Sequence, residues 1–125
     1  METTDLKVSI IGAGNMGGAI ARGLSKGTTV QASNIRVSDI SADHLQALQT
    51  FAPEISISRT NVEIIKYADI IILAVKPWLV ETVAKEIEHK IDYKKQIIVS
   101  IAAGVDFEKL SELFDTEASI FRVIP

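Results

Sequence analysis

The stretch "VSIIGAGNMGGAIARGL", residues 8–24, holds five of the seven glycines in this chain of 125 residues. Gly12, Gly14 and Gly17 have the G-x-G-x-x-G spacing, after an apolar run that predicts a strand and at the start of a helical pattern. In that context the first glycine permits a tight turn, the second lets a pyrophosphate approach the backbone, and the third lets helix and strand pack closely. The unpaired N–H groups at the helix start favour an anion. The alternative, a glycine-rich turn needed only for packing, does not require Gly14; we interpret Gly18 as a packing residue.

Outward from this turn, short apolar runs alternate with longer stretches of helical periodicity. The runs predict six strands separated by five helices, with the strands at 6–11, 34–38, 54–58, 69–75, 96–101 and 119–124. Parallel strands need crossover connections, which are right-handed almost without exception. We therefore expect one α/β domain over residues 1–125, a doubly wound parallel (Rossmann) sheet in the order 3-2-1-4-5-6. The solid apolar run at 69–75 predicts the most deeply buried strand, covered on both faces.

Caps and periodicity predict where the helices begin and which side chains they bury. Ser41 and Asp106 are predicted N-caps, and Pro77 opens a helix. The expected buried positions are Met16, Ile20, Gly23, Leu24 and Gly27 in the first helix, Leu45, Leu48 and Ala52 in the second, Ile64, Ile65 and Ala68 in the third, Val80, Val83, Ala84, Ile87 and Ile91 in the fourth, and Phe107, Leu110, Leu113 and Phe114 in the fifth.

The bulk composition excludes several classes of function. The net charge is −3 with no basic stripe, there is no cysteine, and the longest apolar run, Ile70–Val75, is too short to cross a bilayer. We therefore expect a cytoplasmic protein with no nucleic-acid or membrane partner. No cluster of His, Asp and Glu has metal-ligand spacing, and no nucleophile has a base beside it. His44 and His89 are expected on helix surfaces far from any crevice.

Asp39 is the acid expected for an adenosine ribose, because it follows the second strand about 20 residues beyond the glycines. A carboxylate there accepts hydrogen bonds from ribose hydroxyls and repels a 2′-phosphate, which favours NADH over NADPH. The alternative is a turn residue ahead of the Ser41 cap. Ser38 could contact either cofactor, and Arg36 and Arg59 are the candidate partners for a phosphate.

The carboxyl ends of the fourth and fifth strands should face the glycine turn across the crevice. Residues 74–77 (AVKP) lie there, with residues 101–104 (IAAG) beside them, and their small side chains leave room for a nicotinamide ring. Lys76 is the one charged residue expected at this mouth, either near a ligand or simply solvated. Asn61 is either an adenosine contact or, as we prefer, a helix cap. Trp78 is interpreted as packing.

Four motifs, "IGAGNMGGAIARGL", "ILAVKP", "VSIAAGV" and "FRVIP", resemble in that order the amino-terminal half of pyrroline-5-carboxylate reductases, across essentially the whole chain. The resemblance implies an enzyme of proline biosynthesis that reduces 1-pyrroline-5-carboxylate to L-proline with NAD(P)H. The cofactor site it implies comprises Gly12, Ala13, Gly14, Asn15, Met16, Gly17, Ser38, Asp39, Asn61, Ala74, Val75, Lys76, Pro77, Ala102, Ala103 and Gly104. Asp39 departs from members with a neutral residue at that position. Catalytic residues are not identified.

The resemblance also implies a carboxy-terminal helical domain that this chain does not include, one that forms the family's homo-oligomer and supplies much of the substrate pocket. We therefore expect the cofactor-binding half of a reductase, with little or no turnover by itself. Without the carboxy-terminal domain the chain can be a monomer. The alternatives are a non-catalytic NAD(H)-binding module and the first half of a β-hydroxyacid dehydrogenase or of a coenzyme F420-dependent NADP reductase.

Overall fold

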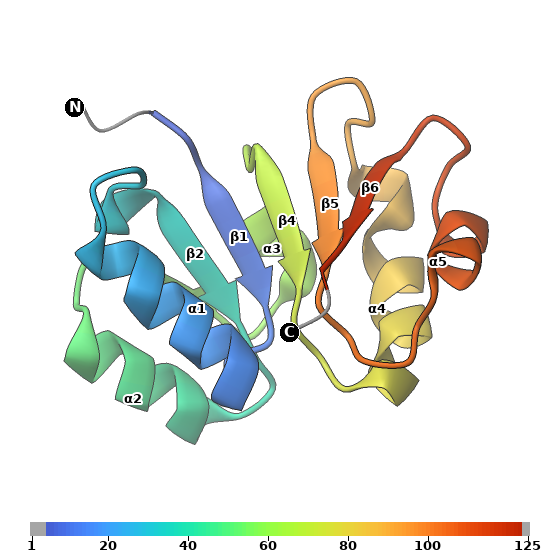
Figure 1. Ribbon diagram of the computed structural model, residues 1–125. Coiled ribbons are helices and arrows are strands. Elements are labelled where there is room, and N and C mark those ends of the chain that lie inside the picture. The colour runs from blue at the N-terminus through green and yellow to red at the C-terminus, as the bar shows by residue number, and fades with distance from the viewer. Residues whose placement is uncertain (1–4, 124–125) are drawn as a thin grey trace.

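The computed structural model describes residues 5–123, which form a six-stranded parallel sheet with helices on both faces (Figure 1). The strands are β1 (Val8–Ile11), β2 (Ile35–Ser38), β3 (Ser56–Ser58), β4 (Ile70–Leu73), β5 (Ile97–Ser100) and β6 (Ser119–Arg122). The helices are α1 (Asn15–Lys26), α2 (Ala42–Phe51), α3 (Asn61–Ile65), α4 (Val80–Ile87) and α5 (Phe107–Leu113), with short 3-10 turns η1 (Ala32–Asn34), η2 (Pro77–Leu79) and η3 (Glu88–Lys90). The order β3-β2-β1-β4-β5-β6 confirms the doubly wound topology.

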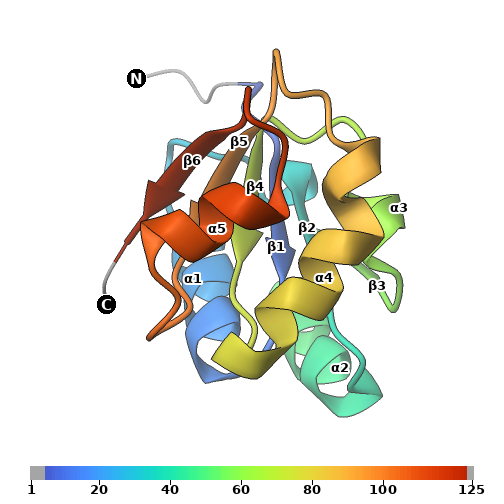
Figure 2. The same cartoon turned by 90° about the vertical axis from the view of Figure 1, so that its right-hand side faces the viewer.

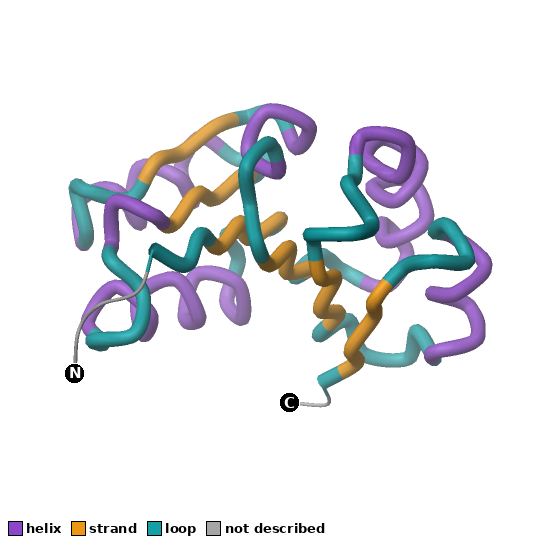
Figure 3. Tube along the Cα trace, turned by 90° about the horizontal axis from the view of Figure 1, so that it is seen from above, coloured by secondary structure: helices purple, strands orange, loops and turns teal. Residues whose placement is uncertain are grey.

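The direction in which the chain winds decides which face each helix covers. From β1 the chain moves through α1 and α2 to one edge of the sheet, then returns through α3 to β4 and continues to the other edge. Right-handed crossovers in opposite directions place their helices on opposite faces. Figure 2 shows α4 and α5 in front of the sheet, and Figure 3 shows the strands as a twisted layer between two sets of helices. The reversal between β1 and β4 leaves their carboxyl ends side by side with no helix between them.

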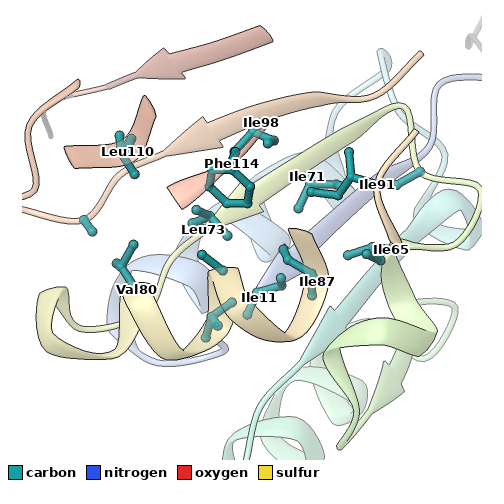
Figure 4. Close-up of a cluster of buried hydrophobic side chains, with 14 of the residues drawn as sticks. Ile11, Ile65, Ile71, Leu73, Val80, Ile87, Ile91, Ile98, Leu110 and Phe114 are labelled. Carbon is teal, nitrogen blue, oxygen red and sulfur yellow. The ribbon is translucent and has the colours of Figure 1, made fainter. Parts of the chain in front are cut away.

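Two apolar clusters, one on each face, hold the layers together. The cluster under α4 and α5 includes Ile11, Leu73, Ile87 and Phe114 (Figure 4). The cluster under α1 and α2 includes Ile10, Ala21, Val37 and Leu48. Burial of a single large aliphatic side chain contributes about 1.5–3 kcal/mol, so both clusters are substantial.

The most completely buried strand is β1, and the prediction for residues 69–75 is wrong on this point. All four residues of β1 are buried, whereas β4 alternates between half-buried and buried positions. Ser9 lies on the α3 face of β1, where its hydroxyl donates to the carbonyl of Ile64. The central strand β1 is covered on both faces, while Ile70 and Ile72 of β4, which pack against the cluster under α1 and α2, are only half-buried.

The prediction of the buried stripe on α1 is wrong for Met16, Gly23 and Gly27 and holds in part for Ile20 and Leu24. The helix buries Gly17, Gly18 and Ala21, while Met16 is 45% exposed. The small residues allow α1 to lie against β1 so closely that the helix is rotated away from the stripe that periodicity favours. Ile20 and Leu24 are half-buried at its border, and Gly23 and Gly27 are exposed.

The remaining helix predictions hold with local exceptions. Ser41 and Asp106 are N-caps as predicted, accepting hydrogen bonds from the backbone N–H groups of His44 and Lys109. Pro77 opens the 3-10 turn η2 ahead of α4, and Ile91 is buried beyond the end of that helix. Phe107 is 55% exposed, contrary to the expected stripe in α5. The predicted end of the last strand at residue 124, and residue 125, lie outside the described residues.

Candidate functional site

Gly12 and Gly17 are glycines because the chain itself leaves no room for a side chain. Gly12 has φ +110°, and a Cβ there would lie 2.5 Å from the carbonyl oxygen of Ala74 on the neighbouring strand end. A Cβ on Gly17 would overlap the carbonyl oxygen of Gly12. Gly18 is more moderately crowded, with 3.2 Å between its Cβ position and the carbonyl oxygen of Ala13, in agreement with a packing role. These residues press the start of α1 onto the turn after β1.

Gly14, in contrast, has no neighbour that forbids a side chain. A Cβ built on this residue meets nothing within 4 Å, and its φ of −74° is open to any residue. Gly14 is the N-cap of α1 and forms no side-chain cap, so no cap side chain satisfies the first N–H groups of the helix. The backbone is therefore bare at a helix N-terminus, which is a favourable environment for a phosphate group.

The carboxylate of Asp39 joins the glycine turn to the start of α2. Its Oδ2 accepts from the Ala13 N–H at 2.6 Å, and its Oδ1 accepts from the Ser41 N–H at 2.7 Å. His44 Nδ1 lies 3.4 Å from Oδ2. Burial raises the pKa of the Asp39 carboxyl, but the N–H groups of Ser41 and Ala13 and the imidazole of His44 outweigh it and hold the pKa below its ordinary value. Asp39 is thus an ionised, well-fixed group at the end of β2.

A cavity of about 410 Å³ opens at the carboxyl ends of β1 and β2, beneath α4. It brings together five of the predicted residues: Gly12, Ser38, Asp39, Asn61 and Val75. Its other lining residues are not among the predicted site residues: Ile11, Ile40, Ser41, His44, Leu79, Thr82, Val83 and Glu86. The exposed surface of the lining is mainly apolar, and polar side chains from β2, α2, α3 and α4 converge on it, as in many small-molecule sites.

Asn61 acts within this cavity and not as a helix cap, so the preferred prediction for it is wrong. The N-cap of α3 is Thr60, without a side-chain hydrogen bond. The Ser38 hydroxyl, fully buried, donates to Asn61 Oδ1 at 2.6 Å, and Asn61 Nδ2 donates to Glu86 Oε2 at 3.3 Å. This chain of hydrogen-bonded polar groups links the end of β2 to α4 along the lining of the cavity.

The expected position of His44 is also wrong, because it lines the cavity at the start of α2. A signal in the sequence could have placed it there. His44 is three residues beyond the Ser41 cap, and its backbone N–H donates to Ser41 Oγ at 3.2 Å. The first turn of a helix capped directly after Asp39 necessarily carries this residue back toward the carboxylate. His89, in η3, does not line the cavity.

Several predicted residues lie near the strand ends without lining the cavity. They are Ala13, Gly14, Asn15, Met16, Gly17, Ala74, Lys76, Pro77, Ala102, Ala103 and Gly104. Lys76 is exposed, and its predicted place near a ligand at the ends of β4 and β5 stays a prediction; the charged residues that line the cavity are Asp39, His44 and Glu86. Trp78 is 74% exposed, so its predicted packing role is wrong. Arg36 donates to the carbonyl of Lys66, away from the cavity, and Arg59 does not line it.

A second hollow, of about 450 Å³, lies at the opposite end of the sheet, between Lys7, Asp69 and Gln96. Gln96 is buried, and its side-chain amide donates to the carbonyls of Ile65 and Ala68, in the segment between α3 and β4. In open α/β sheets, ligands bind outside the carboxyl ends of the strands, where the winding reverses. The cavity beside Gly12 is at that position, and the lysine-rimmed hollow is not.

Two further properties concern residues 5–123 as a whole. Within this range no group of three or more His, Cys, Asp or Glu side chains is arranged to hold a metal ion. No helix in the same range is long and apolar enough to cross a membrane.

Residues 7–104 match the model of a protein family described as "NADP oxidoreductase coenzyme F420-dependent". Among curated proteins, pyrroline-5-carboxylate reductase 3 of Danio rerio is 35% identical over 120 residues, which are 96% of this chain and 41% of that protein. The pyrroline-5-carboxylate reductase of Methanosarcina acetivorans is also 35% identical, over 95% of this chain and 43% of its own length. The chain therefore spans about two fifths of the curated relatives it matches.

The fold is similar to that of a solved reductase structure over nearly the whole chain. The crystal structure of Plasmodium falciparum pyrroline carboxylate reductase with NADP bound superimposes with a TM-score of 0.83 at 25% identity, covering 98% of this chain and 43% of that one.

Proposed function

The chain belongs to the family described as NADP oxidoreductase, coenzyme F420-dependent, and we propose that it binds a nicotinamide dinucleotide at the carboxyl ends of β1, β2 and β4. The diphosphate would lie on the turn from Gly12 to Gly17 at the N-terminus of α1. The adenosine ribose would lie near Asp39, and the adenine in the cavity between Ile40 and Leu79. The nicotinamide ring would face the strand ends at Ala74–Pro77 and Ala102–Gly104.

The observation that carries this proposal is the open space in front of Gly14. Packing within the chain accounts for Gly12 and Gly17, but no contact of the chain accounts for the missing side chain at Gly14. A glycine at an N-cap costs chain entropy on folding, and Ser, Thr, Asp or Asn would satisfy a helix N–H there. A ligand that approaches the backbone closely is a physical reason to keep this position bare.

The matching experiment compares Gly14→Val with Gly23→Ala. Both glycines have nothing within 4 Å of an added Cβ and neither has a positive φ, but Gly23 lies in α1 away from the turn. We expect Gly14→Val to weaken NADH and NADPH binding at least tenfold, about 1.4 kcal/mol, in calorimetric titration while the circular dichroism spectrum is unchanged. Gly23→Ala should bind as the parent chain does. Equal binding by Gly14→Val would contradict the proposed diphosphate position.

Two observations favour different cofactors. Asp39 favours a free ribose 2′-hydroxyl and hence NADH, whereas the Plasmodium falciparum relative was solved with NADP bound. Both carboxylate oxygens of Asp39 already accept hydrogen bonds from the chain, so fewer lone pairs remain for a ribose. We keep NADH as the proposed preference, because the carboxylate repels a 2′-phosphate. Calorimetric titration with both cofactors tests it, and comparable tight binding of NADPH would contradict it.

We further propose that the chain is the cofactor-binding half of an enzyme that reduces 1-pyrroline-5-carboxylate to L-proline by hydride transfer from NAD(P)H. The support is the 35% identity to reductases of that name, over about two fifths of their length. The remaining length would supply the substrate pocket and the oligomer, so the 125-residue chain should bind cofactor and not turn over. Appreciable proline formation by the pure chain with 1-pyrroline-5-carboxylate and NADH would contradict this. A cytoplasmic location is part of the same proposal.

A coenzyme F420-dependent NADP reductase is the second candidate, because the family description names that reaction. It would place a deazaflavin, and not an imine acid, opposite the nicotinamide. Titration of the chain with coenzyme F420 in the presence of NADPH separates the two: saturable deazaflavin binding would favour this candidate.

A further inference from the structure

His44 and Asp39 form a pair at the rim of the cavity, between the end of β2 and the first turn of α2. His44 Nδ1 lies 3.4 Å from Asp39 Oδ2, and the side chains are 53% and 13% exposed, respectively. The Ser41 cap fixes the first turn of α2, so His44 is held at this position by its backbone. The carboxylate is fixed from the other side by the N–H groups of Ala13 and Ser41. The Nδ1 edge of the imidazole therefore faces Asp39, and the remainder of the ring is open to solvent and to the cavity mouth.

The charged groups that surround this pair are few. Those lining the cavity, among the residues the structure describes, are Asp39 from the end of β2, His44 from α2 and Glu86 from α4. Asp43 precedes His44 on α2 and is exposed. Glu86 is held by the amide of Asn61. No lysine or arginine lines the described part of the cavity, so His44 is the side chain there that can carry a positive charge.

We propose that His44 is a specificity-determining residue for the 2′ position of the adenosine ribose, and that its protonation decides whether a 2′-phosphate is accepted. Neutral His44 leaves the charge of Asp39 unbalanced, which favours the 2′-hydroxyl of NADH. Protonated His44 balances Asp39 and offers an N–H donor, which admits the 2′-phosphate of NADPH. This inference rests on the proposed dinucleotide site and adds to it a switch between the two cofactors.

The chemistry of histidine makes this switch available within a mild pH range. Histidine is the side chain whose charge ordinarily changes between pH 5 and 8. Asp39 remains ionised over that range, because its pKa is held below the ordinary value. When His44 carries a proton, the net charge of the pair is 0, and without that proton it is −1. The positive end of α2 lies beside it and adds to the attraction for a phosphate when Asp39 is balanced.

The test is a titration of the 125-residue chain with NADH and with NADPH at pH 5.5 and pH 8.0, at constant ionic strength. Quenching of the single tryptophan, Trp78, provides a second readout beside calorimetry, because it is 74% exposed in η2, next to Leu79 of the cavity wall. The measured quantity is the ratio of the Kd for NADPH to the Kd for NADH. We expect this ratio to fall about tenfold from pH 8.0 to pH 5.5 in the parent chain, which corresponds to about 1.4 kcal/mol.

Two variants separate the effect of His44 from that of the phosphate, which itself takes up a proton near pH 6. His44→Gln keeps a polar side chain without a titratable charge, so its ratio should fall much less on acidification than that of the parent chain, because only the phosphate then takes up a proton. His44→Lys carries a permanent charge, so it should favour NADPH at both pH values. Circular dichroism checks that both variants are folded.

The outcomes separate this inference from the proposed function. If the parent chain and His44→Gln show the same pH dependence of the ratio, His44 does not determine specificity, although the dinucleotide site stands. If neither cofactor binds to the folded parent chain at either pH, the dinucleotide site itself is wrong and the inference is overturned with it. A His44→Lys variant that prefers NADH as the parent does would also overturn the inference.

Discussion

The two halves of the sheet differ in how they are covered. Around β1 and β2, helices α1 and α2 lie on one face and α3 on the other, and seven of the eight residues of these strands are buried. Around β5 and β6, α4 and α5 cover one face, and no described helix lies on the other (Figure 1). On that uncovered face Ile97 and Val99 are half-buried, Phe121 is 58% exposed and Val123 is 50% exposed.

This difference shows that the handedness of the crossovers, and not the hydrophobicity of the strands, decides which face of the sheet each helix covers. The strand β5 is as apolar as β1, yet its residues alternate between buried and half-buried. Right-handed crossovers from β4 to β6 can reach only one face. All-parallel sheets are normally covered on both faces. On the uncovered face of β5 and β6, apolar side chains that would ordinarily be buried are partly exposed to solvent.

The largest expected effect compares two isoleucines on the same face of the sheet. Ile10 in β1 is fully buried under α1, whereas Ile97 in β5 is half-buried on the uncovered face. Ile10→Ala should destabilise the chain by about 2–5 kcal/mol, because it removes methyl groups from a packed core. Ile97→Ala should cost about 1 kcal/mol or less, because water can fill the space. Urea unfolding measures both, and equal losses would contradict the difference between the halves.

An intermediate effect concerns acid stability, which depends on Asp39 in the covered half. Its folded-state pKa is below the ordinary value of 3.8, so the ionised carboxylate stabilises the fold at pH values above that. This contribution is lost as the pH falls through the folded-state pKa. We expect the urea midpoint of the parent chain to fall between pH 5 and pH 3 more steeply than that of Asp39→Asn. Asp5→Asn, exposed near the chain start, is the control and should follow the parent.

The smallest effect on stability is expected at Phe121. Phe121→Ser on the uncovered face should change the free energy of unfolding by about 0.5 kcal/mol or less, because the ring is largely in solvent. The same variant should reduce the fluorescence of the apolar dye 8-anilinonaphthalene-1-sulfonate, since it removes the most exposed ring of that face. A large loss of stability, or unchanged dye binding, would indicate that the face is already covered.

Local signals predicted much of the candidate site. The glycine spacing, the position of Asp39 after the second strand and the two N-caps are encoded within a few residues of each other, and the structure has the expected turn, strand end and caps. Asn61 and His44 were misplaced for a different reason. Each side chain could satisfy a local role, and only the partner from a distant element, Ser38 or Asp39, shows which role it takes.

Burial was the least predictable property, because it depends on where whole elements pack. Met16 and Trp78 have the side chains of core residues, but α1 is rotated onto its small residues and η2 lies at the edge of the fold, so both are exposed. A large apolar side chain next to a glycine-lined contact is displaced from it, since the backbone of the neighbouring element occupies that space.

The sequence by itself determined the strand order, the glycine turn and the acid that follows β2, because these depend on periodicity, chirality and backbone sterics over short distances. The tertiary structure alone decided that Gly14 is free of neighbours, that His44 faces Asp39 and that one half of the sheet keeps a face open. These features depend on which elements meet in space. Contacts between residues that are far apart in the chain cannot be inferred from the local pattern of any single segment.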